Sequence, residues 1–223
     1  DDLEVHWLGR VPYREAWARQ HALVAARAAG DVPDQLLLLE HAPVLTLGRQ
    51  ADPAFVRAAP DELARRGLEV IRVERGGEVT YHGPGQLVAY PIIRLADRGL
   101  MVRPFVRVLE AAMRETCVAL GVGADRRDGF PGCWVEDTAG PRKIGALGVR
   151  VERGVTYHGI ALNVTVDLAA YQLIEACGLP GVNVTSLARE LGRPDEPPST
   201  LSVEAAAAVF GPAFRGLLRA ASA

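Results

Sequence analysis

The chain has 223 residues, which is enough for one well-filled hydrophobic core, and we expect a single domain over residues 1–223. Hydrophobic residues make up 49% and charged residues 23%, so the composition is that of a globular protein rather than a disordered chain. The net charge of −2 argues against nucleic acid as a partner. No apolar run approaches the roughly 20 residues that span a bilayer, so we expect no membrane segment.

Cysteine usage points to a reducing compartment. The three cysteines are odd in number and include no Cys-x-x-Cys pair, which argues against both a disulfide framework and a thiolate metal site. The five histidines show no His-x-x-x-His spacing, so we predict no metal. A cytoplasmic protein with free thiols is the simplest interpretation.

One residue count stands out. Lysine and arginine together number 25, yet Lys143 is the one lysine. Arginine stays protonated in proteins, whereas an amine can lose its proton when its surroundings favour the neutral form. Two interpretations stay open: Lys143 is a surface lysine that survived by chance, or its amine has a chemical role.

The predicted elements begin with a helix over 12–29, which Pro12 opens and Gly30 ends. Apolar segments at 36–39 and 44–47 predict two strands on either side of a turn. Further helices are predicted over 60–66, 103–120, 167–175 and 186–191, with a last helix that Ser202 caps, and further strands over 69–74, 79–81, 87–93, 133–135, 144–151 and 155–166.

The predicted strands outnumber the helices and come mostly in adjacent pairs, such as 144–151 and 155–166 around a tight turn at Arg153-Gly154. This order differs from the βαβ alternation of parallel sheets. We therefore predict an α/β or α+β domain with a mixed, largely antiparallel sheet flanked by helices. The Pro-rich stretch 192–199 is typical of a linker.

A five-residue repeat links two of these strands. The sequence Val-Thr-Tyr-His-Gly occurs at 79–83 and again at 155–159. Val-Thr-Tyr is common in strands, so the match has an ordinary explanation. Alternatively, the two strands bring a His-Gly corner each to one shared cleft.

The strongest local signal is a glycine-rich segment from Arg75 to Gln86, Arg-Gly-Gly-Glu-Val-Thr-Tyr-His-Gly-Pro-Gly-Gln. Glycines let a main chain approach a ligand closely and expose its N–H donors. The segment matches neither a Walker loop nor the dinucleotide fingerprint. A hairpin with glycine turns is the plainer interpretation, but the flanking Arg75 and His82 favour a binding loop.

The segment 142–148 opens a strand in which small residues alternate with apolar ones. Small side chains leave room for a ligand, although they also allow close packing of a sheet against a helix. Lys143 lies at the start of this strand, where it faces either solvent or a cleft.

Cys177 differs from the other two cysteines. Cys117 falls on an apolar helix face and Cys133 in a strand, so both are expected in the core. Cys177 follows a predicted helical segment and precedes a Gly-Leu-Pro-Gly loop, where a thiol can be reached. A free thiol is only a few per cent thiolate at pH 7, and a neighbouring amine can raise that fraction.

These segments together resemble the octanoyltransferase family of protein lipoylation. The glycine loop, the Lys-Ile-small-small strand at 143–148 and the His-Gly-Ile-Ala-Leu-Asn-Val strand at 158–164 match in order. The Cys-Gly at 177–178, with Val-Thr-Ser-Leu at 184–187, matches as well. The resemblance covers roughly residues 35–192, and it departs from the family pattern at Ala176, where the family usually has proline.

The resemblance implies that Cys177 is a nucleophile that carries the acyl group as a thioester, and that Lys143 lowers the pKa of this thiol. It implies transfer of octanoyl, or lipoyl, from acyl carrier protein to a lysine of lipoyl domains in 2-oxoacid dehydrogenases and the glycine cleavage H protein. No cofactor is needed, because thioester to amide is downhill, and we expect a monomer with the catalytic core shared by biotin and lipoate ligases. The implied substrate-binding residues are Arg75, Gly76, Gly77, Glu78, Val79, Thr80, Tyr81, His82, Ala146, Leu147, Gly148, Gly159, Ile160 and Ala161.

Two other functions remain alternatives at this level. An ATP-dependent lipoate-protein ligase would share the fold and the glycine loop, and it would use the lysine to hold an acyl-adenylate without needing the cysteine. A binding module without catalysis would hold a carrier protein or a lipid. Dependence on ATP, and dependence on Cys177, separate these functions from acyl transfer.

Overall fold

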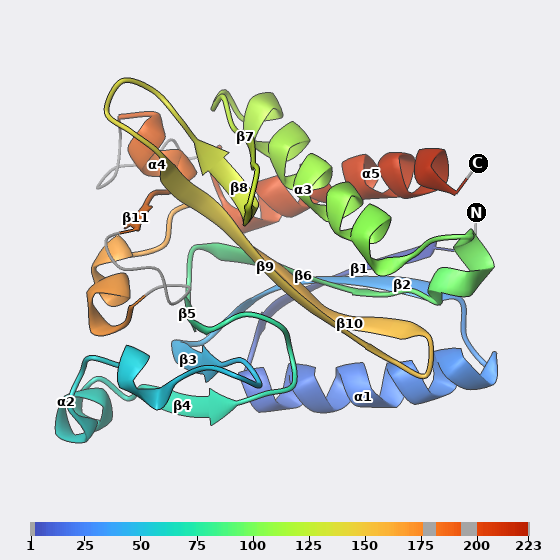
Figure 1. Ribbon diagram of the computed structural model, residues 1–223, viewed down its shortest axis with the longest axis horizontal. Coiled ribbons are helices and arrows are strands. Elements are labelled where there is room, and N and C mark those ends of the chain that lie inside the picture. Colours follow the sequence, from blue (N-terminus) through green and yellow to red (C-terminus); the bar gives the residue numbers. More distant parts are fainter. Residues whose placement is uncertain (1–2, 176–181, 193–199, 223) are drawn as a thin grey trace.

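A twisted mixed sheet with helices on both faces forms the body of the protein (Figure 1). The computed structural model describes residues 3–175, 182–192 and 200–222. Helices α3 and α5 lie together on one face, and α1 lies on the opposite face beside a second, small sheet (Figure 1). The architecture agrees with the predicted fold class, since most neighbouring strands of the large sheet are antiparallel.

Within the described residues, the large sheet has eight strands. Strand β11 (Asn183–Val184) pairs with β9 in parallel, and β1 pairs with β2 in parallel. The remaining ladders are antiparallel. The spatial order is β1 (Leu3–Val11), β2 (Asp34–His41), β6 (Gln86–Ile92), β10 (Val155–Asn163), β9 (Arg142–Glu152), β8 (Phe130–Val135) and β7 (Asp125–Arg127).

In the small sheet, β3 (Val44–Leu47) lies between β4 (Glu69–Arg72) and β5 (Val79–His82). The α-helices are α1 (Tyr13–Ala29), α2 (Pro60–Arg65), α3 (Val102–Ala119), α4 (Leu187–Glu190) and α5 (Val203–Ala221). Short 3₁₀ turns occupy Pro53–Phe55, Leu95–Arg98 and Leu168–Leu173. No helix in the described ranges is long and apolar enough to cross a membrane.

Local signals predicted most of these elements. Strand β3 has the predicted bounds, and Ser202 Oγ accepts a hydrogen bond from the Ala205 N–H at the start of α5. The turn between β9 and β10 has Arg153 and Gly154 at positive φ, 53° and 80°, as a tight two-residue hairpin turn requires. The segment 167–175 forms a 3₁₀ turn rather than an α-helix, and most of the predicted linker lies outside the described residues.

The main core lies between the large sheet and the pair α3 and α5. Phe105 of α3 meets Phe214 of α5 edge to face, with 6.3 Å between ring centroids. Cys117 and Cys133 are both fully buried in this core, as predicted. Their mutual hydrogen bond and their burial raise the pKa of the Cys117 thiol, so this thiol is no nucleophile.

A buried carboxylate joins three elements at the start of β2. Asp34 is 1% exposed and accepts hydrogen bonds from Arg27 Nε of α1 and Arg98 Nε, both at 2.8 Å, and from the Arg94 N–H at 3.0 Å. Arg27 also reaches Asp97, but that carboxylate is 45% exposed. Asp34 is therefore the shared anionic partner of two guanidinium groups that are themselves largely buried.

We predict that Asp34→Ala lowers the free energy of unfolding by about 3 kcal/mol or more, because it leaves buried arginine charge without its partner. The matched variant Asp97→Ala removes an exposed partner of the same Arg27 and should cost about 1 kcal/mol at most. Urea unfolding followed by circular dichroism measures both. Equal losses in the two variants would contradict this account of the network.

Candidate active site

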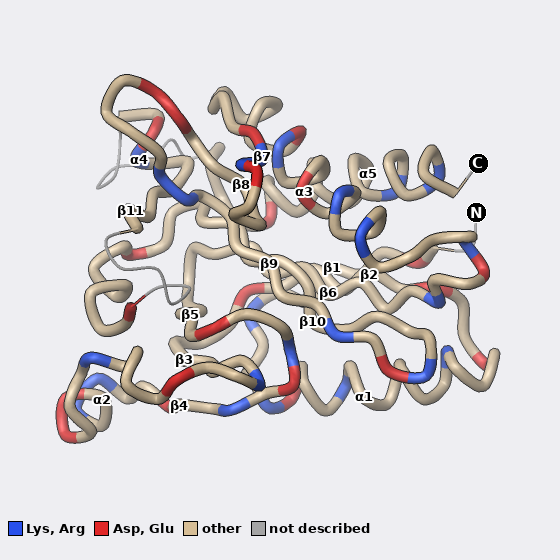
Figure 2. The backbone as a smooth tube through the Cα atoms, in the orientation of Figure 1, with Lys and Arg blue, Asp and Glu red and all other residues tan. Residues whose placement is uncertain are grey.

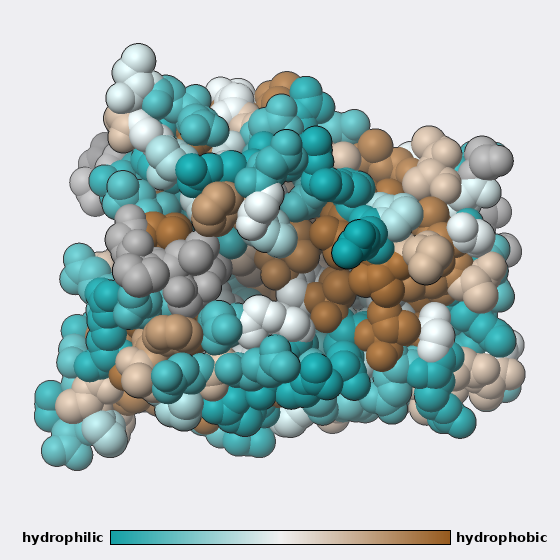
Figure 3. All heavy atoms as spheres, viewed as in Figure 1, coloured by the Kyte–Doolittle hydropathy of each residue, from teal (hydrophilic) through white to brown (hydrophobic). Residues whose placement is uncertain are grey.

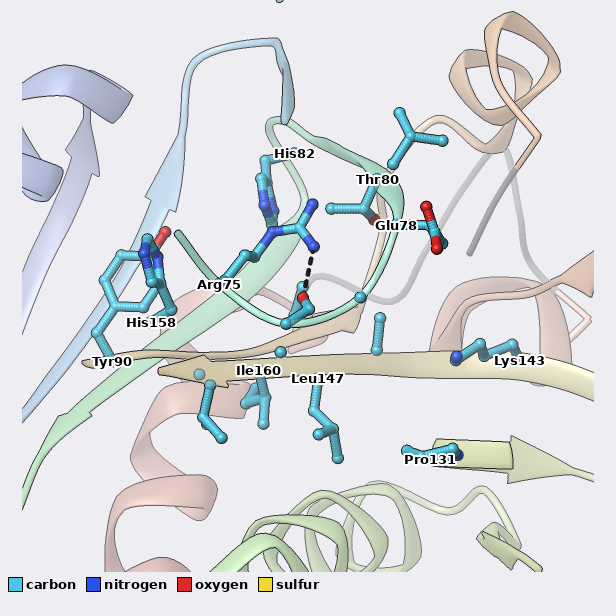
Figure 4. A pocket seen from close by; sticks show the side chains of 18 of the residues that line it. Arg75, Glu78, Thr80, His82, Tyr90, Pro131, Lys143, Leu147, His158 and Ile160 are labelled. Atoms are coloured by element: carbon cyan, nitrogen blue, oxygen red, sulfur yellow. Dashed lines mark hydrogen bonds between the residues drawn. The ribbon is translucent and has the colours of Figure 1, made fainter. Parts of the chain in front are cut away.

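A cavity of about 470 Å³ lies between the glycine-rich loop and the strand pair β9 and β10. Figure 4 shows the loop arching over one side of the cavity and β9 with β10 forming the other side. Apolar atoms dominate the wall, and Figure 3 shows a brown, hydrophobic hollow over these strands between hydrophilic bands. Few charged residues occur in the middle of β9 and β10 (Figure 2). The charged residues of this region lie mainly toward the strand ends and on the helices.

Close backbone contacts fix the loop on the sheet. A Cβ atom on Gly148 of β9 would lie 2.5 Å from the Gly76 carbonyl oxygen, and one on Gly48 would lie 1.8 Å from that of Gly77. The loop is also held by hydrogen bonds from Gly76 N–H to the Val149 carbonyl and from Gly48 N–H to the Glu78 carbonyl. Any side chain at Gly148 or Gly48 would lift the loop and change the shape of the cavity.

Arg75 braces the loop from within. Its side chain donates to the Thr46 carbonyl and the Thr46 hydroxyl, both at 2.8 Å, and to the Gly76 carbonyl at 3.0 Å. Only 8% of Arg75 is exposed, so its charge acts on neighbouring groups through a medium of low polarity. It therefore disfavours a second positive charge at this part of the cavity.

Lys143 faces the cavity rather than solvent, which resolves the question that the sequence left open. It lines the cavity and is 8% exposed. Its Nζ lies 5.2 Å from the centroid of the Trp134 ring, within cation–π range. Figure 4 shows it at one end of the cavity, beyond Leu147 on the same strand.

Strand β8 forms a slot for this lysine. Gly132 has a φ of 128°, and a Cβ there would lie 2.8 Å from Lys143 Cε and 2.4 Å from the Gly145 carbonyl oxygen. The Gly132 N–H donates to the buried carboxylate of Glu110 on α3, at 3.1 Å. The Trp134 ring is oriented by its own N–H, which donates to the Phe130 carbonyl at 2.9 Å. The slot thus fixes the direction of the Lys143 side chain.

The opposite end of the cavity is polar. His158 and Tyr90 lie there, far from Lys143 (Figure 4), and Tyr13 and His82 complete this end. His41 Nδ1 is 2.8 Å from the Val11 carbonyl, so this nitrogen carries a proton and donates it. His41 Nε2 then accepts from the Tyr90 hydroxyl at 2.8 Å. His82 Nδ1 pairs with Gln86 Oε1 at 2.7 Å.

His158 has an unusual backbone. Its φ is 54°, a left-handed conformation that is uncommon outside glycine and found in few strand residues. Its N–H donates to Gln20 Oε1 of α1 at 2.7 Å, and its Nε2 lies 3.4 Å from Glu74 Oε2. Its Nδ1 is buried and has no hydrogen-bond partner among the described residues. The surrounding structure therefore holds this imidazole in one position.

Burial keeps this end of the cavity uncharged. Burial lowers the pKa of His158 to about 4, with a further lowering by the Arg75 charge, and burial lowers the pKa of His41 to about 4. Burial, with contributions from His41 and Arg75, holds the pKa of His82 well below its usual range. Burial raises the pKa of Tyr13 to about 12. All four side chains are therefore neutral at pH 7.

The structure brings together nearly all of the sequence-predicted substrate-binding residues. Lys143 and every member of that set except Tyr81 line the cavity. Tyr81 points the other way, because side chains alternate along β5, and its ring packs against Tyr171 with 5.9 Å between centroids. The repeat at 79–83 and 155–159 places both of its histidines, His82 and His158, on the cavity wall.

Sequence reasoning missed several lining residues as site candidates. Tyr90 stands within an apolar strand, where its hydroxyl was the one available signal, and Tyr13 is distant in the chain on α1. The others are Val149, the turn residue Gly129, and Phe130 and Pro131 at the start of β8.

Cys177 lies outside the described residues, as do Ala176 and the Gly-Leu-Pro-Gly segment. The chain re-enters the described structure before β11, where Val184 pairs with Lys143 of β9 and the Thr185 N–H donates to the Lys143 carbonyl at 2.9 Å. The segment that carries Cys177 is thus followed, seven residues on, by a strand beside Lys143.

Comparisons with known proteins match most of the chain. Residues 12–215 match the family model described as the lipoyl protein ligase A/B catalytic domain. The chain is 49% identical to the octanoyltransferase of Chloroflexus aurantiacus over 192 residues, which cover 86% of this chain and 85% of that protein. That relative is similar along most of both chains.

Solved structures with low sequence identity share the fold. A structure of the bi-partite lipoate protein ligase and its E2 lipoyl domain from Thermoplasma acidophilum matches with a TM-score of 0.64 at 17% identity, covering 97% of this chain and 84% of that one. The biotin protein ligase from Aquifex aeolicus matches with a TM-score of 0.55 at 11% identity, covering 97% and 70%.

We predict that the free energy of unfolding falls by about 4 kcal/mol between pH 7 and pH 5. In the unfolded chain, His41 and His158 take up protons as the pH drops through their ordinary pKa of about 6.5, whereas the folded forms stay neutral until about pH 4. Their stabilisation is therefore complete above pH 6.5 and is lost as the pH falls toward 4. Urea unfolding at pH 7, 6 and 5 measures the loss, and a constant stability over this range would contradict it.

Proposed function

Because the chain belongs to the octanoyltransferase family, and so transfers octanoyl from acyl carrier protein to lipoyl domains, we propose that the cavity holds the octanoyl chain and that Cys177 carries it as a thioester. The observation that carries the proposal is the position of Lys143. The one lysine of the sequence is buried at the end of an apolar cavity, and three separately predicted segments, 75–86, 142–148 and 158–164, contribute to its wall. A surface lysine that survived by chance would have no reason to lie there.

The first step loads the enzyme. The Cys177 thiolate attacks the thioester carbonyl of the octanoyl-carrier protein, the new C–S bond forms, and the carrier's C–S bond breaks. The Lys143 ammonium stabilises the thiolate before attack and gives a proton to the departing carrier thiolate. The acyl group is then bound to Cys177, and Lys143 is a neutral amine.

The second step unloads it. The acceptor lysine of a lipoyl domain attacks the acyl-enzyme carbonyl with its neutral amine, forming an amide, and the Cys177–carbon bond breaks. Lys143 takes the proton that the incoming nitrogen releases, which restores the ammonium and thiolate pair. The conversion of a thioester into an amide is favourable, so this sequence of steps consumes no ATP.

The cavity supplies binding energy for the chain. Seven carbons beyond the carbonyl, at about 0.8 kcal/mol for each buried methylene, contribute on the order of 5 to 6 kcal/mol. Leu147, Ile160 and Val149 provide apolar surface along the cavity. The same surface keeps water away from the thioester.

The proposal extends to the setting of the reaction. Acceptors are the lipoyl domains of 2-oxoacid dehydrogenases and of the glycine cleavage H protein, and the enzyme acts as a monomeric single domain in the cytoplasm. The free, buried thiols of Cys117 and Cys133 suit a reducing compartment. Sedimentation of the purified chain tests the monomer.

Surface arginines are the natural candidates for docking an acidic carrier protein, but several of them have partners within the fold. Arg72 donates to three backbone carbonyls of the segment 48–51, and Arg142 bridges Asp137 and Glu190. Arg127 lies over the Phe130 ring at 4.6 Å. These side chains contribute positive charge to the surface. Because each already has a partner within the fold, they are poor candidates for direct ion pairs with a docked carrier protein.

An ATP-dependent ligase remains the natural rival for this fold. Ligases are the structural matches, but their identity to this chain is only 11–17%, whereas the octanoyltransferase relative is 49% identical. A ligase would transfer free octanoate when ATP is supplied and would work without Cys177. Transfer from octanoyl-carrier protein without ATP is the expected result here.

We predict that intact-mass analysis after mixing with octanoyl-carrier protein finds one added octanoyl group. Hydroxylamine should remove the group, because it cleaves thioesters, and Cys177→Ala should not acquire it. Cys117→Ala is the matched control and should be loaded normally, since that thiol is buried in the core. An adduct that survives hydroxylamine, or that forms in Cys177→Ala, would refute the proposed nucleophile.

We predict that Lys143→Arg lowers the transfer rate roughly 100-fold or more, because arginine keeps the charge but cannot act as a base. Trp134→Leu should lower it roughly 3- to 30-fold by removing the aromatic face that holds the ammonium, and Trp134→Phe should lose less. Single-turnover transfer to a lipoyl domain measures all three. Wild-type rates in Lys143→Arg would exclude Lys143 as a base.

A further inference from the structure

We propose that Asn163 is a positioning residue for the reacting pair Lys143 and Cys177. Its buried side-chain amide ties together the two described flanks of the segment that carries the cysteine, Tyr171 on one side and Thr185 on the other. The inference rests on the proposed function, in which Lys143 and Cys177 act together. Asn163 does not line the cavity, so it acts through these residues rather than on the acyl chain.

Asn163 is the last residue of β10, and the sheet ladder places it opposite Gln86, the first residue of β6. Both side chains are buried, with 3% of Asn163 and 0% of Gln86 exposed. A buried amide without hydrogen bonds costs free energy, so each of its polar atoms needs a partner. Most of the partners of this pair come from segments that are distant in the chain, which makes the pair a junction between elements.

Both polar atoms of the Asn163 side chain have partners. Its Nδ2 donates to the Thr185 carbonyl at 3.0 Å, and its Oδ1 accepts from the Tyr171 hydroxyl at 3.1 Å and from Gln86 Nε2 at 3.0 Å. These partners fix the orientation of the amide, because a carbonyl oxygen can only accept and therefore faces the nitrogen. One amide thus holds a residue that precedes Cys177 by six positions and a residue that follows it by eight.

Thr185 connects Asn163 to Lys143. The Thr185 N–H donates to the Lys143 carbonyl at 2.9 Å, so the backbone of Thr185 is bonded to Lys143 on one side and to Asn163 on the other. The Thr185 hydroxyl donates to Glu190, which accepts two hydrogen bonds at 2.9 Å from Arg142, the residue before Lys143. The chain at β11 is therefore held against the start of β9 (Figure 1).

The flank that precedes Cys177 is held as well. Tyr171 lies in the 3₁₀ turn before it, and the Tyr171 hydroxyl lies 3.0 Å from Gln86 Nε2. Further along, the Glu175 N–H donates to the Phe55 carbonyl at 2.7 Å. The described chain on this side is therefore fixed up to two residues before Cys177, and a single amide joins it to the end of β11.

Fixed flanks favour the meeting of thiol and amine. A nucleophile and its proton partner need to lie within about 2.6–3.2 Å of each other, and a misplacement of about 1 Å can slow a reaction roughly 100-fold. Bringing the thiol to the amine costs less conformational entropy when the ends of its segment are already held. Loss of the Asn163 amide would release the flanks from each other, weaken the effect of the Lys143 charge on the thiol and slow the chemistry. The cavity wall that binds the acyl chain would stay intact.

The first test follows alkylation of Cys177 by iodoacetamide across pH in the full chain, read by intact mass, for wild type and Asn163→Ala. In wild type, the Lys143 charge should hold the midpoint of this profile below the ordinary thiol value of about 8.5. Asn163→Ala should move the midpoint up by roughly one pH unit. A merely structural role of Asn163 would leave the midpoint where it is in wild type.

The second test measures loading of the same proteins by octanoyl-carrier protein in single turnovers. The rate at saturating carrier should fall roughly 30- to 100-fold in Asn163→Ala, because the reacting groups are misplaced. The carrier concentration that gives half-maximal loading should change less than about threefold, since the cavity wall is untouched.

Tyr171→Phe is the milder variant, and it decides the outcome if Asn163→Ala does not fold. It removes one hydrogen bond to Asn163 and keeps the ring, so loading should slow roughly 3- to 10-fold. Asn183→Ala, which removes an exposed asparagine side chain from β11, is the matched control and should load like wild type. Asp34→Ala weakens the fold elsewhere and should keep the wild-type alkylation midpoint.

Wild-type alkylation midpoints and loading rates in folded Asn163→Ala, or in Tyr171→Phe when only that variant folds, would overturn the proposal. A midpoint shift in Asp34→Ala as large as that in Asn163→Ala would overturn it too, because the effect would then follow from lost stability. Absence of any acyl adduct on wild-type protein would instead refute the proposed function.

Discussion

The cavity depends on close backbone contact at one pair of residues, Gly148 and Gly159, which face each other in the β9–β10 ladder. The missing side chain of Gly148 lets the Gly76 carbonyl rest on the sheet, and that of Gly159 lets the Ala89 carbonyl approach from β6. These contacts fix the loop above the strands and fix β10 beside β6. The cavity has its shape because the backbone itself, rather than adjustable side chains, forms both contacts.

This pair divides the cavity into two ends with different chemistry. At one end, a slot made by Gly132 and Trp134 directs a cationic amine toward the cavity. At the other end, burial and the Arg75 charge keep His82 and His158 neutral by lowering the pKa of each. A second protonated group at the far end would draw water into an apolar site. With the far end neutral, the proposed function assigns proton transfer to the Lys143 end of the cavity.

The sequence predicted what is encoded in short segments. The Arg153-Gly154 turn, strand β3 and the cap at Ser202 follow from local residue preferences. The family resemblance of the glycine loop and of the 143–148 and 158–164 strands implied most of the residues that line the cavity. Other features depend on contacts between distant segments. Strand β1 mixes polar and apolar residues and contains Gly9, so the sequence did not predict the strand or its pairing with β2. Strands β7 and β11 are too short to show the alternation of polar and apolar residues that indicates a strand. Tyr13 reaches the cavity only because α1 packs across the sheet.

His158 shows how a local rule can fail at the wall of the cavity. A histidine in a strand is expected to follow the alternation of its neighbours, yet its positive φ breaks that alternation, and a hydrogen bond to Gln20 on α1 holds it there. The register between β10 and β6 places Pro91 opposite His158. Proline has no N–H to donate, so the ladder between the two strands lacks one hydrogen bond at this position. The local cost of the left-handed conformation is thus reduced where the ladder is already incomplete. A buried helix side chain then completes the hydrogen bonding, so a regular ladder there would remove the imidazole from the cavity rather than only relieve strain.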